Sequence, residues 1–233
     1  MKLCGLQGIS VIDFPGHIAS VLFLGGCNFR CPFCHNAELV LHPDAQPDIS
    51  VEDALRTIAQ RKALVDSVVV TGGEPLVSGA ALRDLLRRLR EAGLKVKLDT
   101  NGYEVEALQE VLGAGLVDYV AMDVKTSLER YGEAAGRTVD AQRIQSSVAA
   151  IAASGVAHEF RTTCVPGLVG REEVRAIATL LGGKEHYVLQ QYRAAHGVLD
   201  PAYADITPYP PAVVRSLAEE AAPLVGSTAV RGV

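Results

Sequence analysis

Three cysteines stand close together near the start of the chain, in the spacing Cys27-x3-Cys31-x2-Cys34. The other two cysteines, Cys4 and Cys164, are distant in sequence. Structural zinc sites and closed iron–sulfur sites are completed by four protein ligands. Three clustered thiolates can instead hold a 4Fe–4S cluster at three irons and leave the fourth iron open to another ligand. We therefore predict that these three cysteines bind a catalytic 4Fe–4S cluster.

Zinc and disulfides are the alternative uses of these cysteines. A zinc site would need a fourth ligand, and His35 is the nearest candidate. His35 directly follows Cys34, and two adjacent residues rarely both bind one tetrahedral metal ion. Disulfides are disfavoured because the total of five cysteines is odd. The first residues also lack the apolar core of a secretory signal, so we expect a cytoplasmic protein in a reducing compartment. Cys4 and Cys164 are then most simply small buried side chains.

Apolar segments of strand length alternate with segments of helical spacing along the rest of the chain. The predicted strands are Ala19–Leu24, Ser67–Thr71, Lys95–Asp99, Leu116–Met122, Ala157–Cys164 and His186–Gln190. A last helix is expected over about residues 210–222. Such alternation is typical of α/β folds with a parallel sheet. An open doubly wound sheet and a partial barrel would both produce it, so the pattern alone leaves the two open.

Glycine and charged residues follow several of the predicted strands. They are Gly72, Gly73 and Glu74 after the second strand, Asp99 and Thr100 at the end of the third, Asp123 and Lys125 after the fourth, and Arg161 within the fifth. In a barrel such strand ends carry the chemistry, because glycine permits close approach of a ligand and a carboxylate accepts charge-assisted hydrogen bonds. Each group also has an ordinary interpretation as a turn, a solvated strand end or a structural arginine.

The cysteine spacing, with the aromatic Phe33 just before Cys34, resembles the signature of the radical S-adenosylmethionine (SAM) superfamily. The resemblance implies a partial, six-stranded (β/α) barrel, which we expect to form a single domain over residues 1–233 with a cluster loop at 25–36. It also implies that SAM binds the open iron and that the reduced cluster cleaves SAM to a 5′-deoxyadenosyl radical. Beyond the cluster and SAM, no catalytic side chain is implied.

The same resemblance suggests which residues contact SAM. Thr-Gly-Gly-Glu-Pro is similar to the glycine-rich segment of the family, so that Gly72, Gly73 and Glu74 would meet the methionine ammonium of SAM. The Cys-His-Asn sequence after the last cluster cysteine is similar to a segment that borders the adenine, which implies cofactor-binding roles for His35 and Phe33.

Two further segments resemble those of the enzymes that activate glycyl radical enzymes. In Asp-Thr-Asn-Gly and Asp-Val-Lys, the resemblance implies that Asp99 and Asp123 hold a monovalent cation against the SAM carboxylate, with Thr100 beside Asp99. Oxygen ligands suit such hard cations. Lys125 is expected to reach SAM as a positive charge, and Arg161 to contact its ribose or carboxylate.

The N-terminal segment Gly8–His17 narrows the expected function. It resembles the activating enzymes of anaerobic (class III) ribonucleoside-triphosphate reductases and, at slightly greater distance, the pyruvate formate-lyase activating enzymes. The implied reaction is hydrogen abstraction from a backbone glycine of the partner reductase, with flavodoxin or ferredoxin as electron donor. The resemblance gives Asp13 a contact with the partner's glycine loop.

Two other functions stay open. A small-molecule radical SAM enzyme, such as a deazapurine synthase, would need a pocket for a nucleotide-like substrate, and an iron–sulfur protein could simply bind a partner. The chain also departs from the formate-lyase activases, because Gln190, Gln191, Tyr192 and Arg193 occupy the segment where those enzymes have a histidine. Its five cysteines leave none for the additional ferredoxin domain of other activases.

The composition excludes several classes of protein. The chain has 233 residues, is 48% hydrophobic and carries a formal net charge of −5. This length suits one larger α/β domain. Interspersed charges of negative balance argue against a nucleic-acid partner, which requires a basic stripe. No apolar run approaches the roughly 18 residues of a membrane span, so we expect no membrane partner.

Overall fold

The computed structural model of the protein describes residues 1–193 and 197–233. The chain forms two compact units. The first comprises residues 1–28, 38–121 and 153–157, and the second comprises residues 29–37, 122–152 and 158–233. The predicted cluster loop therefore begins in the first unit and continues in the second.

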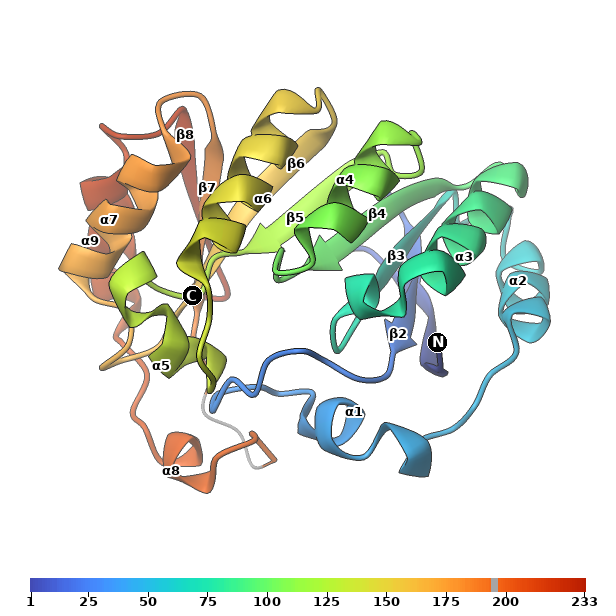
Figure 1. The fold of residues 1–233 in the computed structure, drawn as a ribbon, viewed down its shortest axis with the longest axis horizontal. Coiled ribbons are helices and arrows are strands. Elements are labelled where there is room, and N and C mark those ends of the chain that lie inside the picture. The colour runs from blue at the N-terminus through green and yellow to red at the C-terminus, as the bar shows by residue number, and fades with distance from the viewer. Residues whose placement is uncertain (194–196) are drawn as a thin grey trace. The chain divides into compact units, whose positions relative to one another are not determined.

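Within residues 1–193 and 197–233, eight strands are hydrogen-bonded in chain order, from β1 to β8, and Figure 1 labels β2 to β8. Six of them correspond to the predicted strands: β2 (Ala19–Leu24), β3 (Ser67–Gly72), β4 (Lys95–Thr100), β5 (Tyr119–Asp123), β6 (Ala157–Cys164) and β7 (His186–Gln191). The remaining two, β1 (Leu3–Ser10) and β8 (Ser227–Arg231), were not predicted. Glycines at positions 5 and 8 interrupt the side-chain pattern of β1, which explains why it was missed.

In the first unit, β1 is antiparallel to β2, and β2, β3 and β4 are parallel. Ala19 pairs with Ser67 and Leu24 pairs with Gly72, so β2 and β3 end at the same level. Val70 of β3 pairs with Leu98 of β4. This register places the segments that follow β2, β3 and β4 at the same end of the strands.

The helices of the first unit follow the predicted apolar patterns. They are α1 (Ala37–Leu41, whose first residue belongs to the second unit), α2 (Val51–Ala59), α3 (Gly79–Glu91) and α4 (Val105–Gly113), with 3-10 turns at Pro43–Ala45 and Pro75–Ser78. Ser50 caps the N-terminus of α2, because Ser50 Oγ accepts a hydrogen bond of 3.0 Å from the backbone N–H of Asp53. Helix α3 buries one apolar side along its length, formed by Leu82, Leu85, Leu86 and Leu89.

In the second unit, β6, β7 and β8 are parallel, and Gln190 of β7 pairs with Arg231 of β8. The helices are α5 (Tyr131–Ala135), α6 (Ala141–Ala153, whose last residue belongs to the first unit), α7 (Arg171–Leu181), α8 (Pro201–Ala204) and α9 (Pro211–Ala221), with a 3-10 turn at Leu128–Arg130. Helices α7 and α9 pack side by side, and α9 also contacts β7 and β8 (Figure 1). Across residues 1–193 and 197–233, no helix combines the length and apolar character needed to cross a membrane.

Candidate functional site

The first half of the cluster loop is held by the glycines that follow β3. The backbone N–H of Gly73 donates to Leu24 O, and that of Glu74 donates to Gly26 O, both at 2.8 Å. A Cβ atom on Gly73 would lie only 1.8 Å from Gly26 O. Gly72 has a φ of 123°, and a Cβ there would lie 2.3 Å from the backbone of Leu24. These two glycines therefore allow the two strand-end loops to touch through their backbones.

Glu74 is a buried carboxylate that joins two segments of the first unit, the one after β3 and the end of β4. Glu74 is only 1% exposed to solvent. Oε1 accepts hydrogen bonds from Thr100 Oγ1 at 2.7 Å and from Leu76 N at 3.0 Å. Oε2 accepts a bond of 2.6 Å from the backbone N–H of Asn101. The predicted residues Glu74 and Thr100 are thus brought together at the ends of β3 and β4.

Asn101 connects this carboxylate to Cys27, the first of the three predicted cluster cysteines. Its Nδ2 donates to Asn28 Oδ1 at 2.7 Å and lies 3.9 Å from Cys27 Sγ. Asn28 Nδ2 in turn donates to Glu104 Oε1 at 3.1 Å. Asn101 was not among the predicted site residues, although it stands in the Asp-Thr-Asn-Gly segment that drew attention to its neighbours.

Asp99 forms an ion pair with Lys97, a residue that the sequence analysis did not single out. The Lys97 ammonium contacts Asp99 Oδ1, and both side chains belong to β4. Lys97 is 1% exposed, whereas the Asp99 side chain retains 17% exposure. Residues two apart on a strand share a face, so the expected site residue Asp99 could have pointed to Lys97 as its partner.

The second half of the cluster loop lies in the second unit, where the segment around α8 holds it. The backbone N–H of Cys34 donates to Cys31 O at 3.1 Å, which closes a turn between these two cysteines. Leu199 N donates to Cys34 O at 3.2 Å, and Asp200 N donates to Pro32 O at 2.9 Å. The carbonyl groups of the loop are thereby fixed by residues far away in sequence.

Helix α5 supports the same loop from its C-terminal end. Arg30 N donates to Ala135 O at 2.8 Å. Gly136 caps α5 with a φ of 64°, and a Cβ atom there would lie 2.0 Å from Arg30 O. The rings of Phe29 and Tyr131 also pack edge to face, with centroids 6.2 Å apart.

His35 and Phe33 contact aromatic residues that follow β7. The His35 ring stacks on Tyr192 with an interplanar angle of 6°, and its Nε2–H donates to Arg193 O at 2.8 Å. Phe33 packs against Tyr203 with ring centroids 6.4 Å apart. The Gln190–Arg193 segment therefore orders His35, the residue that follows Cys34.

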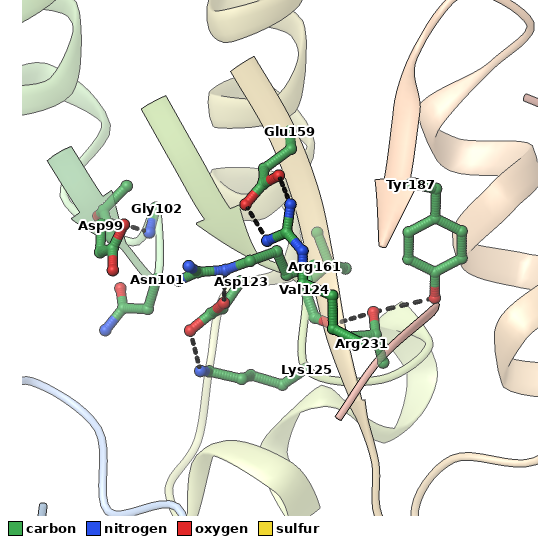
Figure 2. Close-up of polar contacts among 12 residues, drawn as sticks. Asp99, Asn101, Gly102, Asp123, Val124, Lys125, Glu159, Arg161, Tyr187 and Arg231 are labelled. Carbon is green, nitrogen blue, oxygen red and sulfur yellow. Dashed lines mark hydrogen bonds and ion pairs between the residues drawn. The ribbon is translucent and has the colours of Figure 1, made fainter. Parts of the chain in front are cut away.

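Asp123 at the end of β5, Lys125 just after it and Arg161 within β6 form one ionic group. Figure 2 shows the Asp123 carboxylate between the two cations, with Lys125 Nζ at 2.9 Å and Arg161 Nε at 2.8 Å. Burial alone would raise the pKa of Asp123, but the charges of Arg161 and Lys125 outweigh it and hold the pKa well below its usual value. The group thus carries two positive charges and one negative charge at neutral pH.

The structure adds a second charged pair to this face of the second unit. Arg231 of β8 donates two hydrogen bonds, of 2.7 and 2.6 Å, to the carboxylate of Glu159 on β6 (Figure 2). Glu159 is 1% exposed. Because Glu159 and Arg161 are two residues apart on β6, they belong to the same face of the strand. The sequence analysis missed this pair because β8 was not predicted.

Asp13 lies away from the strand-end groups of its own unit. It belongs to the turn between β1 and β2, where its Oδ2 accepts a hydrogen bond of 2.5 Å from Ser10 Oγ. Strand β2 runs for six residues between this turn and the loop that contains Cys27. By the rise of a strand, the two ends are about 20 Å apart. The structure therefore does not bring Asp13 together with Cys27.

The sequence match decides the family. The model of the radical SAM superfamily matches residues 21–181, which is more than half of the chain. The chain belongs to the radical SAM superfamily. It is therefore an enzyme, and its cofactors are a 4Fe–4S cluster and SAM.

Similar proteins lie within this radical SAM family. The chain is 34% identical over 192 residues to a protein of Methanocaldococcus jannaschii named "Putative glycyl-radical enzyme activating enzyme", covering 81% of this chain and 78% of that one. It is 29% identical over 128 residues to the pyruvate formate-lyase-activating enzyme of Clostridium pasteurianum, covering 53% of this chain and 52% of that one.

A solved structure of the superfamily shares the fold. SuiB of Streptococcus suis, determined with SAM bound, superposes with a TM-score of 0.64 at 18% identity. The match covers 91% of this chain and 52% of SuiB, so the chain spans about half the length of that protein. This likeness confirms the predicted fold class, the α/β fold of radical SAM enzymes.

The residues present suit the cluster. All five cysteines are described, and each is a thiol rather than part of a disulfide. Among the described residues, no group of three or more histidine, cysteine or acidic side chains converges on one metal position. Such convergence suits a single ion, whereas each thiolate of a 4Fe–4S cluster binds a different iron. Burial raises the pKa of Cys31 to about 11, although the charge of Lys125 opposes this, so iron must displace a proton there.

Proposed function

We propose that this enzyme activates an anaerobic ribonucleoside-triphosphate reductase by forming a glycyl radical on it. The observation that carries the proposal is the similarity to a named activating enzyme over four fifths of the chain, at 34% identity. The choice of a reductase as partner rests on the Gly8–His17 segment and on the Cys-Pro-Phe-Cys-His-Asn sequence of the cluster loop.

We assign the cluster to Cys27, Cys31 and Cys34. When bound, the cluster and SAM would supply the radical chemistry for hydrogen abstraction from the substrate glycine. The protein's own contribution is to hold the cysteine loop in place and to keep charge and hydrogen bonds in fixed positions. Both halves of the loop have such support within their own units.

The glycine and acidic residues of the first unit fit the predicted contacts with SAM. Gly72 and Gly73 leave backbone accessible where a side chain would not fit. The Glu74 carboxyl group is the acceptor we assign to the methionine ammonium, in addition to its bonds within the protein. Thr100 and Asp99 lie at the adjoining strand end, and Thr100 orients Glu74 through its hydroxyl group.

The charged residues of the second unit fit an anionic part of SAM. Lys125 and Arg161 both pair with the carboxylate of Asp123. We assign Lys125 to SAM as a positive charge and Arg161 to the ribose or carboxylate of SAM, interactions of the charge-assisted kind. His35 and Phe33, held by tyrosines of the segment after β7, are assigned to the border of the adenine.

The partner reductase is proposed to contact the turn that contains Asp13. Val11 and Ile12 in this turn are 71% and 83% exposed, which is unusual for two adjacent large apolar residues. We also propose that the two units work as one catalytic domain. A flavodoxin or ferredoxin would supply the electron, and the cytoplasm would supply the reducing conditions that the thiols need.

Electron paramagnetic resonance with candidate partners tests the proposed function. The cluster-loaded, reduced enzyme is mixed without oxygen with SAM and with an anaerobic reductase or a formate-lyase-type enzyme. A glycyl doublet on the reductase supports the proposal. A doublet on the formate-lyase-type enzyme alone favours the alternative partner, to which the 29% identity with a formate-lyase activase points. SAM cleavage without any glycyl radical would favour a small-molecule substrate, such as that of a deazapurine synthase.

A further inference from the structure

A chain of buried hydroxyl groups ends at Val124, the residue between Asp123 and Lys125. The carbonyl oxygen of Val124 accepts a hydrogen bond of 2.7 Å from Thr162 Oγ1. Thr162 Oγ1 in turn accepts a hydrogen bond of 2.9 Å from the hydroxyl of Tyr187 (Figure 2). Thr162 is 1% exposed, and Val124 and Tyr187 are fully buried. These hydrogen bonds are therefore shielded from solvent.

The direction of each hydrogen bond in this chain is fixed by chemistry. A carbonyl oxygen only accepts, so Thr162 must donate its single hydroxyl proton to Val124 O. The Thr162 oxygen can then only accept from Tyr187. Burial raises the pKa of Tyr187, which keeps the proton on its hydroxyl. Each hydroxyl thus has one orientation, and the hydrogen bonds of such a chain polarise one another.

Thr162 lies on the face of β6 opposite to the charged residues. It directly follows Arg161, and adjacent residues of a strand point to opposite faces. Glu159 and Arg161 share the other face. Thr162 thus supports the backbone after β5 from behind β6 and takes no part in the ionic group itself.

Further hydrogen bonds hold both neighbours of Lys125. The backbone N–H of Val124 donates to Arg161 O at 2.8 Å, so both polar backbone groups of Val124 are bound to β6. On the other side, the buried hydroxyl of Thr126 donates to Leu168 O at 2.7 Å. Because Val124 and Thr126 are held in place, the start of the lysine side chain is fixed between them.

We propose that Thr162 and Tyr187 are positioning residues for SAM. Through Val124, their hydroxyl chain fixes the backbone from which Asp123 and Lys125 reach the cofactor. This inference rests on the proposed assignment of the ionic group to SAM. A role in stability alone would lower the melting temperature and leave SAM affinity unchanged, so the two roles differ in a measurable way.

The SAM affinity of Thr162 variants tests this role. Binding to the cluster-loaded enzyme is measured by anaerobic titration calorimetry. Electron paramagnetic resonance of the reduced cluster gives the SAM concentration at the midpoint of the spectral change. Thr162→Val keeps the shape but removes the hydroxyl, so SAM should bind about tenfold more weakly. Thr162→Ser keeps the hydroxyl and should bind within about twofold of the wild type.

Tyr187→Phe tests the outer end of the chain. Thr162 still donates to Val124 O in this variant, so SAM affinity should fall only about threefold. Added to Thr162→Val, the same change should cause no further loss, because Tyr187 acts through Thr162. Wild-type affinity in Tyr187→Phe would overturn the proposal, as would an additional loss in the double variant. The Tyr187→Phe result stands even if Thr162→Val does not fold.

Leu217→Ala is the matched control for stability. Leu217 is buried in α9, outside the hydroxyl chain. Its truncation should lower the melting temperature and leave SAM affinity within about twofold of the wild type. Thermal unfolding and iron content are measured for every variant. Equal losses of SAM affinity in Thr162→Val and Leu217→Ala would show that the threonine acts through stability alone, against the proposal.

Lys125→Met separates this inference from the assignment on which it rests. Loss of the ammonium should weaken SAM binding at least as much as Thr162→Val does. Weak binding in Lys125→Met beside wild-type affinity in Thr162→Val would refute the inference alone. Wild-type affinity in Lys125→Met would refute the assignment of Lys125 to SAM, and this inference with it. No partner protein enters these measurements, so their outcome is independent of whether the reductase is the true substrate.

Discussion

Glu74 Oε2 and the backbone N–H of Asn101 are joined by a buried hydrogen bond of 2.6 Å. The side chain of the same asparagine lies 3.9 Å from Cys27 Sγ. A carboxylate after β3 is thus linked, through one residue after β4, to the first cysteine of the cluster loop. Changes at Glu74 should therefore affect both SAM binding and the cluster.

Replacing Glu74 should weaken SAM binding and reduce cluster retention. Glu74→Ala removes a charged acceptor, which corresponds to about 1.5–3 kcal/mol of SAM binding free energy. Glu74→Gln keeps the size but presents an NH2 group to either Thr100 or Asn101, so iron content should also fall. Titration calorimetry and iron analysis measure both effects. Glu110→Gln, at an exposed ion pair with Arg83, is the matched control. Wild-type affinity in Glu74→Gln would contradict the assigned role.

Gly136→Ala should disturb the cluster loop more than an equivalent change elsewhere. Gly136 and Gly115 have φ values of 64° and 62°, so alanine brings backbone strain of about 1–2 kcal/mol at both. Only at Gly136 would the new Cβ meet another group, Arg30 O at 2.0 Å. We expect a lower melting temperature and less bound iron in Gly136→Ala than in Gly115→Ala. Equal behaviour of the two variants would argue against this contact.

The three loop cysteines, and not the other two, should be needed for the cluster. Alanine at Cys27, Cys31 or Cys34 should abolish the cluster, whereas Cys4→Ala and Cys164→Ala should retain about four iron atoms per chain after anaerobic reconstitution. Iron and sulfide analysis and the visible absorption of the cluster measure this. Full loading of a loop variant would refute the assignment, as would stoichiometric zinc in the folded wild type.

Cys164 should resist alkylation in the folded enzyme. Burial raises the pKa of this thiol to about 12, and its side chain is inaccessible, so almost no reactive thiolate is present at pH 8. Iodoacetamide followed by mass spectrometry should leave Cys164 unmodified until denaturant is added. Because a thiol becomes reactive only as pH approaches its pKa, raising the pH to 9 should change this little. Rapid labelling under native conditions would indicate local opening of β6.

His35→Phe and His35→Ala should separate stacking from hydrogen bonding beside the last cysteine. Phenylalanine keeps the contact with the Tyr192 ring but loses the bond of 2.8 Å to Arg193 O, and alanine loses both. The rate of cluster loss in air should rise from wild type to His35→Phe and again to His35→Ala. The decay of visible absorption measures it. Identical rates in all three would mean that these contacts do not hold the loop.

The sequence predicted the strands well where they are buried on both faces. Val68, Val69 and Val70 form a continuous apolar run and are fully buried in β3. Strand β1 lacks such a run because Gly5 and Gly8 interrupt it, and it is held by antiparallel pairing with β2 rather than by its own pattern.

The contacts that order the site were harder to predict. Lys97 alternates with Lys95 around Val96, a pattern typical of an exposed strand edge, yet tertiary packing buries Lys97 and leaves Lys95 exposed. The stacking of His35 on Tyr192 joins residues distant in the chain, and no local pattern signals such a pair. Local sequence revealed which residues are chemically capable, whereas their partners depend on the fold.

The burial of Cys31 also determines which cysteine thiols oxidise first if the proposed cluster is lost. With a pKa of about 11 and only 8% exposure, this sulfur is a protonated thiol at neutral pH, while Cys27 and Cys34 are more exposed. Oxidation to sulfenic acid follows thiolate character and exposure. The first damage should therefore fall on the two outer cysteines, at a stage that thiol reductants reverse. Cys31 should stay reduced and able to bind iron again, so the damage caused by brief exposure to air should be reversible.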